Sequence, residues 1–401
     1  MLAIRVNQVF DGQQIVTGAG LVFVDQGRIV GIESATLDIP EVCRVLDYRN
    51  ATVLPGLIDA HVHLLADGGL GALDRLADYS ADDCDRVIEQ TLRVNLASGV
   101  TTVRDLGDRN YAVVNWRSGH AGAVAPTIVA SGPPITTPQG HCWNMGGEAA
   151  GPTALRAAVR ERAARGVDLI KIMASGGAMT AGTSMTQGQY GVDDLALVVA
   201  EAHEAGLSVT AHAHPLAVIR DAIVAGVDGI EHCTFMTEAG MDFAPEVVAM
   251  LAERQIAVCP TLGSIPGASL PPQLTEILRL SGLTRESRNQ RIVALQDSGV
   301  RLISGTDGGI GPGKPHGLLT QAIAQLVLAG MAPDKALACA TSVSAEACGI
   351  GHRKGRIRVG HDADLLVVDG NPLTDIAALT RVAAVILNGE PVPSADLLLS
   401  Q

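Results

Sequence analysis

The sequence is poor in aromatic side chains, in paired cysteines and in positive charge. Aromatic residues make up only 2% of the 401 residues, so nothing predicts a pocket that stacks a large aromatic ligand. The seven cysteines are scattered and include no CxxC pair, which is typical of reduced thiols. The 29 basic residues are outnumbered by 42 acidic ones, giving a formal charge of −13. This balance argues against a nucleic acid or an anionic membrane as the partner.

Long apolar segments and a secretion signal are also missing. No apolar run reaches the length that spans a bilayer. The first residues, 1–5, lack the charged and apolar regions of a signal peptide. The sequence therefore predicts a soluble, cytoplasmic protein with no membrane association, and it leaves open whether the chain forms a homo-oligomer.

Two kinds of pattern divide the chain. Residues 1–50 hold short strand-like runs separated by turn pairs such as Asp11-Gly12, which is typical of antiparallel β-structure. From residue 51, short β-rich runs alternate with amphipathic helical patterns. The expected strands span 52–58, 100–105, 126–131, 167–173, 207–212, 227–231, 256–261 and 300–305. Strand-like runs return near the end, at 363–368 and 382–387.

Eight strands, each followed by a helix, are the number that a closed (β/α)8 barrel requires. A doubly wound open sheet is the alternative, but no GxGxxG follows the first strand. We therefore predict an α/β fold with a TIM barrel over residues 53–353. Both chain ends, residues 1–52 and 354–401, are expected to form one small accessory domain that resembles a β-sandwich.

The stretch Gly56–His63 continues an apolar run from Thr52 to Ile58 and ends in two histidines. Residues two apart on a strand point to the same side, so His61 and His63 project together just past the strand end. Two imidazoles aimed at one point are a metal-ligand arrangement. Taken alone, the pair could equally be two solvated loop histidines.

Other expected strands also end in side chains that bind metals. In a (β/α)8 barrel the active site lies at the carboxyl ends of the strands. Lys171 lies between isoleucines in the fourth strand, where burial lowers a lysine pKa and leaves a neutral amine that can react with carbon dioxide. The alternative is a lysine that reaches solvent. The further candidates, which together with these predict a metal site, are His212, His214, His232 and Asp307.

This pattern resembles the amidohydrolase superfamily, and within it the binuclear type with a carboxylated lysine. The residues that carry the resemblance are His61, His63, Lys171, His212, His232 and Asp307, with the closing stretch 360–368. The segments that resemble its Xaa-Pro/Xaa-Arg dipeptidase-like branch are 135–141, 171–177 and 201–203.

The resemblance implies two divalent metal ions, most simply Zn²⁺, although manganese, cobalt and iron accept the same donors. The residues that it gives to one ion are His61, His63 and Asp307. Those that it gives to the other are His212 and His232. Lys171, carboxylated on its side-chain nitrogen by carbon dioxide, bridges the two ions. His214 is then a residue of the substrate pocket or a neighbour that supports the ligands.

The implied reaction is hydrolysis of an amide-type carbon–nitrogen bond by a metal-bridging hydroxide. The small-molecule substrate would be a dipeptide, an N-acyl amino acid, a carbamate or a urea. Asp307 takes the proton of the water and delivers it to the leaving nitrogen. His141 is expected to bind substrate and stabilise the oxyanion, with Tyr190 as a second candidate. Both could instead be ordinary loop or core residues.

Two other functions remain open. One is a mononuclear deaminase or cyclic-amide hydrolase of the same superfamily, although members of that type lack the fourth-strand lysine. The other is a non-enzymatic relative that keeps only the barrel. Two further residues, Arg104 and Asp105, follow the second strand and are expected to form a structural ion pair, and Asp59 is expected to orient a neighbouring loop.

Overall fold

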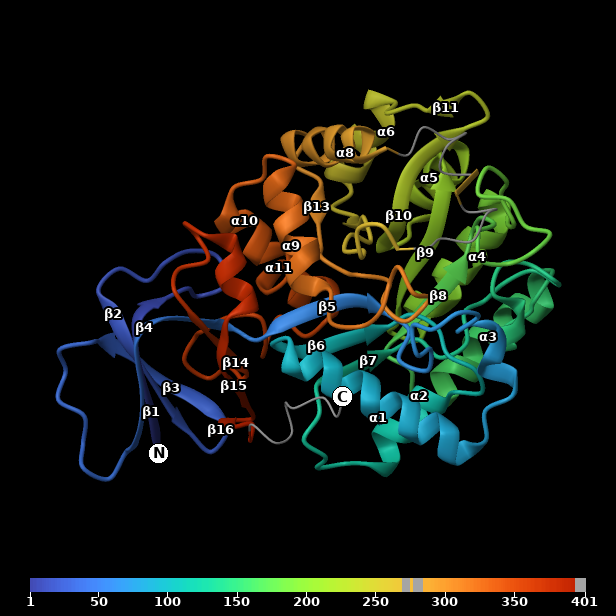
Figure 1. Cartoon of the computed structure of the whole chain (residues 1–401). Coiled ribbons are helices and arrows are strands. Elements are labelled where there is room, and N and C mark those ends of the chain that lie inside the picture. Colours follow the sequence, from blue (N-terminus) through green and yellow to red (C-terminus); the bar gives the residue numbers. More distant parts are fainter. Residues whose placement is uncertain (269–274, 277–283, 394–401) are drawn as a thin grey trace.

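The protein is described by a computed structural model over residues 1–268, 275–276 and 284–393. This part of the chain forms a TIM barrel with an accessory β-sheet at one end (Figure 1). The predicted fold class is therefore confirmed.

The barrel strands form two sheets in which neighbours run parallel. One sheet holds β5 (Leu57–Val62), β6 (Val100–Asp105) and β7 (Thr127–Ala130). The other holds, in spatial order, β13 (Arg301–Leu302), β12 (Ala257–Cys259), β10 (Gly229–Thr237), β9 (Ser208–Pro215) and β8 (Leu169–Met173). A two-residue strand, β11 (Gly240–Met241), pairs with the end of β10.

Backbone contacts join the two sheets into a closed ring. A parallel bridge between Val62 and Gly308 connects β5 with the segment after β13, and another between Ile135 and Ile172 connects the segment after β7 with β8. Because the ring is closed, the carboxyl ends of all its strands meet at one rim. Residues far apart in the sequence, such as those that follow β5 and β13, therefore become neighbours there.

Helices surround the barrel (Figure 1). They are α1 (Ala81–Ala97), α2 (Ala112–Gly119), α3 (Pro152–Ala164), α4 (Val192–Glu204), α5 (Leu216–Ala225), α6 (Pro245–Glu253), α8 (Arg285–Asp297), α9 (Leu319–Leu328), α10 (Pro333–Cys339) and α11 (Ser342–Ala347). The first begins at a capping box, in which the Ser80 hydroxyl accepts the Asp83 N–H and the Asp83 carboxylate accepts the Ser80 N–H. Among the described residues, no helix has both the length and the apolar character that a bilayer crossing needs.

Both chain ends build the accessory sheet, where blue and red strands lie side by side in Figure 1. Its order is β16 (Glu390–Pro391), β15 (Val382–Leu387), β14 (Leu365–Asp369), β4 (Arg44–Pro55), β1 (Leu2–Val9), β2 (Ala19–Asp25) and β3 (Arg28–Ser34). Strand β1 is antiparallel to β2 but parallel to β4, so the sheet is not purely antiparallel as expected. Side chains from both ends, such as Ile4, Val53 and Val367, share one apolar core.

The run 52–58, predicted to be one barrel strand, is divided at Gly56. Strand β4 ends in the accessory sheet at Pro55, and the barrel begins with β5 at Leu57. A side chain at the division has no room, since a Cβ on Gly56 would lie 2.1 Å from the Thr101 hydroxyl oxygen. The domain boundaries at 52/53 and 353/354 stay predictions, and residues 394–401 lie outside the described part.

Candidate metal centre

The side chains expected to bind metal all line one cavity at the carboxyl rim of the barrel. The cavity has a volume of about 140 Å³. Its polar lining consists of His61, His63, His141, Cys142, Lys171, His212, His214, His232 and Asp307. Its apolar lining consists of Leu73, Met173, Ala178, Met179, Met185 and Ile310. The structure thus gathers residues from six barrel strands or the loops that follow them, namely β5, β7, β8, β9, β10 and β13.

The first group of potential ligands joins β5 to the segment after β13. The Asp307 Oδ1 lies 3.3 Å from the Nε2 of His61 and 3.3 Å from the Nε2 of His63. The peptide N–H of Asp307 donates to the His61 carbonyl at 2.7 Å, which fixes the carboxylate beside both rings. Asp307 has a positive φ of 60°, an uncommon conformation that the surrounding contacts must maintain.

The far nitrogens of these two histidines are already engaged. The Nδ1 of His61 faces the Glu231 carboxylate at 2.7 Å, and the Nδ1 of His63 faces the Gly107 carbonyl at 3.0 Å. Both partners only accept hydrogen bonds, so each Nδ1 carries a proton and each Nε2 is turned toward Asp307. Two ring nitrogens and a carboxylate oxygen therefore face one another, an arrangement that a divalent cation would stabilise.

The pKa values of Asp307, His61 and His63 are shifted by burial and by the contacts among these groups. Burial raises the pKa of Asp307, whereas the neighbouring His61 and His63 rings lower it. The effect of the rings is larger, so the pKa of Asp307 lies below its ordinary value. Burial and the Lys171 charge lower the pKa of His61 to about 4, so that ring is neutral near pH 7. For His63, burial lowers the pKa but the hydrogen bond to Asp307 and its charge outweigh this effect and raise it. Ionised Asp307 and neutral His61 are the protonation states that metal binding needs.

The second group lies at the ends of β9 and β10. The ligand atoms of His212, His214 and His232 lie within 4.8 Å of one another. The ring centroid of His232 is 4.4 Å from that of His212 and 4.7 Å from that of His214. The structure therefore brings His214, expected as a pocket residue, almost as close to His232 as the expected ligand His212.

Lys171 lies in the middle of β8, and its side chain is fully buried in the same cavity. Among the described residues, its Nζ has no hydrogen-bond partner. Burial lowers the pKa of this amine, opposed by the charges of Glu231 and Asp307. A buried nitrogen without a partner is costly, so the site fits a group that would occupy this nitrogen, such as a carbamate bound to metal.

A buried ion pair supports the first group from inside the barrel. The Glu231 carboxylate accepts hydrogen bonds from His61 Nδ1, from the Arg104 guanidinium at 2.8 Å and from the Thr210 hydroxyl at 2.6 Å. The expected pair between Arg104 and Asp105 is wrong: Arg104 binds Glu231, and Asp105 accepts the Leu64 N–H. Sequence reasoning missed the role of Glu231, although a carboxylate in an apolar strand needs a buried partner.

Asp59 orients the segment that precedes Asp307, as the sequence suggested. Its carboxylate accepts the Thr306 N–H at 2.9 Å and the Thr306 hydroxyl at 2.7 Å. Burial raises the pKa of Asp59 to about 6, against the lowering effect of these hydrogen bonds. The contacts hold the end of the eighth barrel strand against the first.

The two candidates for binding the substrate carbonyl lie in different surroundings. His141 lines the cavity, with its ring centroid 4.7 Å from that of His212 and its Nδ1 3.0 Å from the Thr180 hydroxyl. Tyr190 is buried, its hydroxyl donates to the Ala149 carbonyl at 2.7 Å, and it is not among the lining residues. The structure thus brings His141, but not Tyr190, to the potential metal ligands.

A barrel with nitrogen and oxygen ligands at its strand ends is the architecture of the amidohydrolases, and the chain belongs to that family. The model of the amidohydrolase family matches residues 52–392. The match includes every potential ligand described above.

Individual relatives give the branch within the family. The chain is 28% identical to an ochratoxinase from Aspergillus niger, over 94% of this chain and 82% of the relative. It is 28% identical to a Xaa-Pro dipeptidase solved with methionine in its active site, with a TM-score of 0.85 over 98% and 99% of the two chains. It is 27% identical to a prolidase solved with N-methylphosphonate-L-proline, with a TM-score of 0.83 over 98% and 99%. The protein is a hydrolase of the dipeptidase-like branch.

Proposed function

We propose that the protein hydrolyses an amide-type carbon–nitrogen bond of a small substrate with two divalent metal ions, most simply zinc. The observation that carries this proposal is the buried Nζ of Lys171, which has no hydrogen-bond partner among the described residues and shares a cavity with two groups of ligand atoms. Carboxylation of that nitrogen by carbon dioxide would turn an unpaired amine into an oxygen ligand that both ions could share.

The proposed assignment keeps the order of the barrel strands. The residues for one ion are His61, His63 and Asp307. Those for the other are His212 and His232, with carboxylated Lys171 shared between the ions. His214 completes the wall of the substrate pocket beside His232.

In the proposed reaction the metal ions and the protein side chains have separate roles. When bound, such ions lower the pKa of water and polarise a carbonyl. Asp307, ionised and held against His61, accepts the proton of the attacking water and delivers it to the leaving nitrogen. His141 donates to the substrate oxygen as negative charge develops there, since its ring faces the cavity.

The relatives suggest which substrates to test first. Those found by comparison include a Xaa-Pro dipeptidase, a prolidase bound to a proline phosphonate and an ochratoxinase. We therefore propose dipeptides, including Xaa-Pro, and N-acyl amino acids as the first panel, followed by carbamates and ureas. The loops around the rim decide among them, because they build the pocket.

The deciding experiment measures metal content per chain, on protein purified without chelator and with bicarbonate, and then turnover of the panel. Two equivalents of metal with turnover of an amide-type substrate are the expected result. One equivalent, with deamination or ring opening in place of amide hydrolysis, would overturn the binuclear assignment. No bound metal and no activity on adding metal would overturn the proposal altogether.

A further inference from the structure

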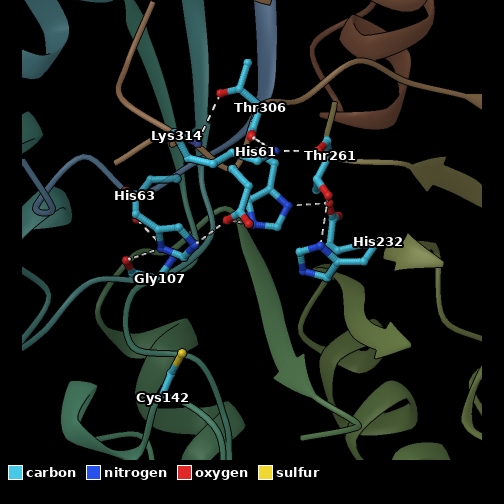
Figure 2. A network of polar contacts seen from close by, with 12 residues as sticks. His61, His63, Gly107, Cys142, His232, Thr261, Thr306 and Lys314 are labelled. Carbon is cyan, nitrogen blue, oxygen red and sulfur yellow. Dashed lines mark hydrogen bonds and ion pairs between the residues drawn. The ribbon is translucent and has the colours of Figure 1, made fainter. Parts of the chain in front are cut away.

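One side chain outside the proposed ligand set joins the carboxyl ends of two neighbouring barrel strands. Lys314 lies in the loop after β13, and its ammonium donates to the Thr261 carbonyl at 2.6 Å and to the Thr306 carbonyl at 2.8 Å. Figure 2 shows it beside His61 and His63, between Thr306 and Thr261. Thr261 follows β12 and Thr306 follows β13, so one ammonium holds the ends of the seventh and eighth barrel strands together.

Thr261 connects Lys314 to the proposed ligand His232. The Thr261 hydroxyl pairs with His232 Nδ1 at 2.9 Å, which leaves the Nε2 of that ring for a metal (Figure 2). Thr261 has a positive φ of 47°, a conformation that β-branched residues rarely adopt. Such a backbone persists only where its surroundings hold it, and the Lys314 ammonium on its carbonyl is part of that restraint.

Thr306 connects Lys314 to the proposed ligand Asp307, which is the next residue in the chain. The N–H and hydroxyl of Thr306 are bound by the Asp59 carboxylate, and its carbonyl is bound by Lys314. The polar groups of Thr306 are therefore held from two sides. Because Asp307 is the next residue, these contacts set where its carboxylate lies.

The loop does not need the ammonium for its own closure. Within it, the Lys314 N–H donates to the Gly311 carbonyl at 2.8 Å and the Gly309 N–H donates to the Lys314 carbonyl at 2.7 Å. These backbone bonds form the turn whatever side chain stands at position 314. The ammonium instead extends from the turn to the two strand ends.

We propose that Lys314 is a positioning residue that fixes His232 and Asp307 together and so couples the two halves of the metal centre. The inference rests on the proposed binuclear site, in which these two residues serve different ions. The loss of Lys314 would release both strand ends at once. It would therefore weaken the binding of both ions, although among the described residues the Lys314 ammonium hydrogen-bonds to the Thr261 and Thr306 carbonyls and to neither ligand.

The test is Lys314→Met, which keeps the length of the side chain and removes its hydrogen bonds. Metal-free protein is titrated with Co²⁺ while the visible absorption of the bound ion and the number bound are recorded. We expect both dissociation constants to rise by roughly 10–100-fold, the usual effect of losing an outer partner of a metal ligand, with an altered cobalt spectrum. The matched control is Lys335→Met, at an exposed position of α10, which should leave both unchanged.

Two further variants separate positioning from a general loss of structure. Lys314→Arg retains donors for two carbonyls and should restore much of the affinity. Thr261→Val keeps the branched side chain but removes the hydroxyl from His232. If Lys314 acts through Thr261, the effect of Lys314→Met on one ion should shrink when Thr261→Val is already present.

The outcomes are distinguishable from failure of the proposed function. A wild-type protein that takes up no cobalt overturns the metal centre and this inference with it. A wild-type protein that binds two ions, with Lys314→Met equal to it in affinity and spectrum, overturns only the role of Lys314. If Lys314→Met does not fold, wild-type cobalt affinity and spectrum in Thr261→Val would overturn the coupling through His232.

Discussion

The Glu231 carboxylate accepts a hydrogen bond from His61 Nδ1 at 2.7 Å, although the two residues lie 170 positions apart in the chain. The same carboxylate binds the buried guanidinium of Arg104. One side chain thus orients a proposed metal ligand and neutralises a buried cation, so its removal should affect both metal binding and folding.

Glu231→Gln should lower the free energy of unfolding by about 3–5 kcal/mol, because it leaves the charge of Arg104 buried without its partner. It should also weaken metal binding by roughly 10–100-fold, because the amide is a poorer acceptor for His61. Urea unfolding and metal titration measure the two effects. The control is Glu201→Gln, whose two arginine partners are largely exposed, and it should lose far less. Equal losses in both variants would contradict this account.

If the proposed function holds, Lys171→Ala should reduce the bound metal from two ions to at most one and lower kcat/KM by at least about 100-fold, because the proposed shared ligand is gone. A short carboxylate such as propionate, added at high concentration, should restore part of the activity by occupying the vacated space. Metal analysis and steady-state kinetics measure this, with Lys335→Ala as the control. Unchanged turnover in Lys171→Ala would exclude the bridging role.

His141→Ala should lower kcat by about 10²–10³-fold, because it removes the donor that the proposed function assigns to the developing oxyanion. Metal content should stay at the wild-type value, since His141 is outside the proposed ligand set. The comparison variant is His120→Ala, whose ring stacks on Trp116 away from the cavity. A loss of bound metal in His141→Ala, or an effect on KM alone, would assign His141 a different role.

Asp108→Asn should change how stability depends on pH. Burial, followed by the charge of Asp105, raises the pKa of Asp108 to about 8 from an ordinary value of 3.8. Between these values the folded chain retains a proton that the unfolded chain has lost, so wild-type stability falls as the pH rises through this window. Asparagine has no such proton to lose.

From pH 5 to pH 8, the Tm of wild type should therefore fall relative to that of Asp108→Asn, by at least about 2 °C. Thermal unfolding at several pH values measures it, with Asp297→Asn, at an exposed position, as the comparison. A difference that stays constant with pH would show that Asp108 loses its proton at the same pH in both states.

Most of the barrel could be predicted because its signals are local. The predicted strand at 100–105 matches β6 because a short run rich in β-branched residues favours a strand without help from distant contacts. The division at Gly56 could not be predicted, since it depends on the distant Thr101 and on pairing with β14. The parallel pairing of β1 with β4 was missed for the same reason, because it joins segments that are not adjacent in the chain.

The potential ligands could be predicted because each one follows an apolar run, and a barrel brings such positions to one rim. The contacts around them could not. Arg104 was assigned to its neighbour Asp105, whereas the closed barrel brings it to Glu231 from the sixth strand. Tyr190 is expected as a second candidate for the oxyanion, whereas in the structure its buried hydroxyl donates to the Ala149 carbonyl.

The pairing of both chain ends in one sheet also determines the order in which this protein can be completed during synthesis. Strand β4 leaves the ribosome early, but its partner β14 begins only at Leu365. Until then one edge of β4 presents unpaired peptide groups while the whole barrel is being made, and such an edge invites association with other chains. A nascent chain that stalls inside the barrel would keep that edge open, so the accessory sheet can close only after β14 has been made.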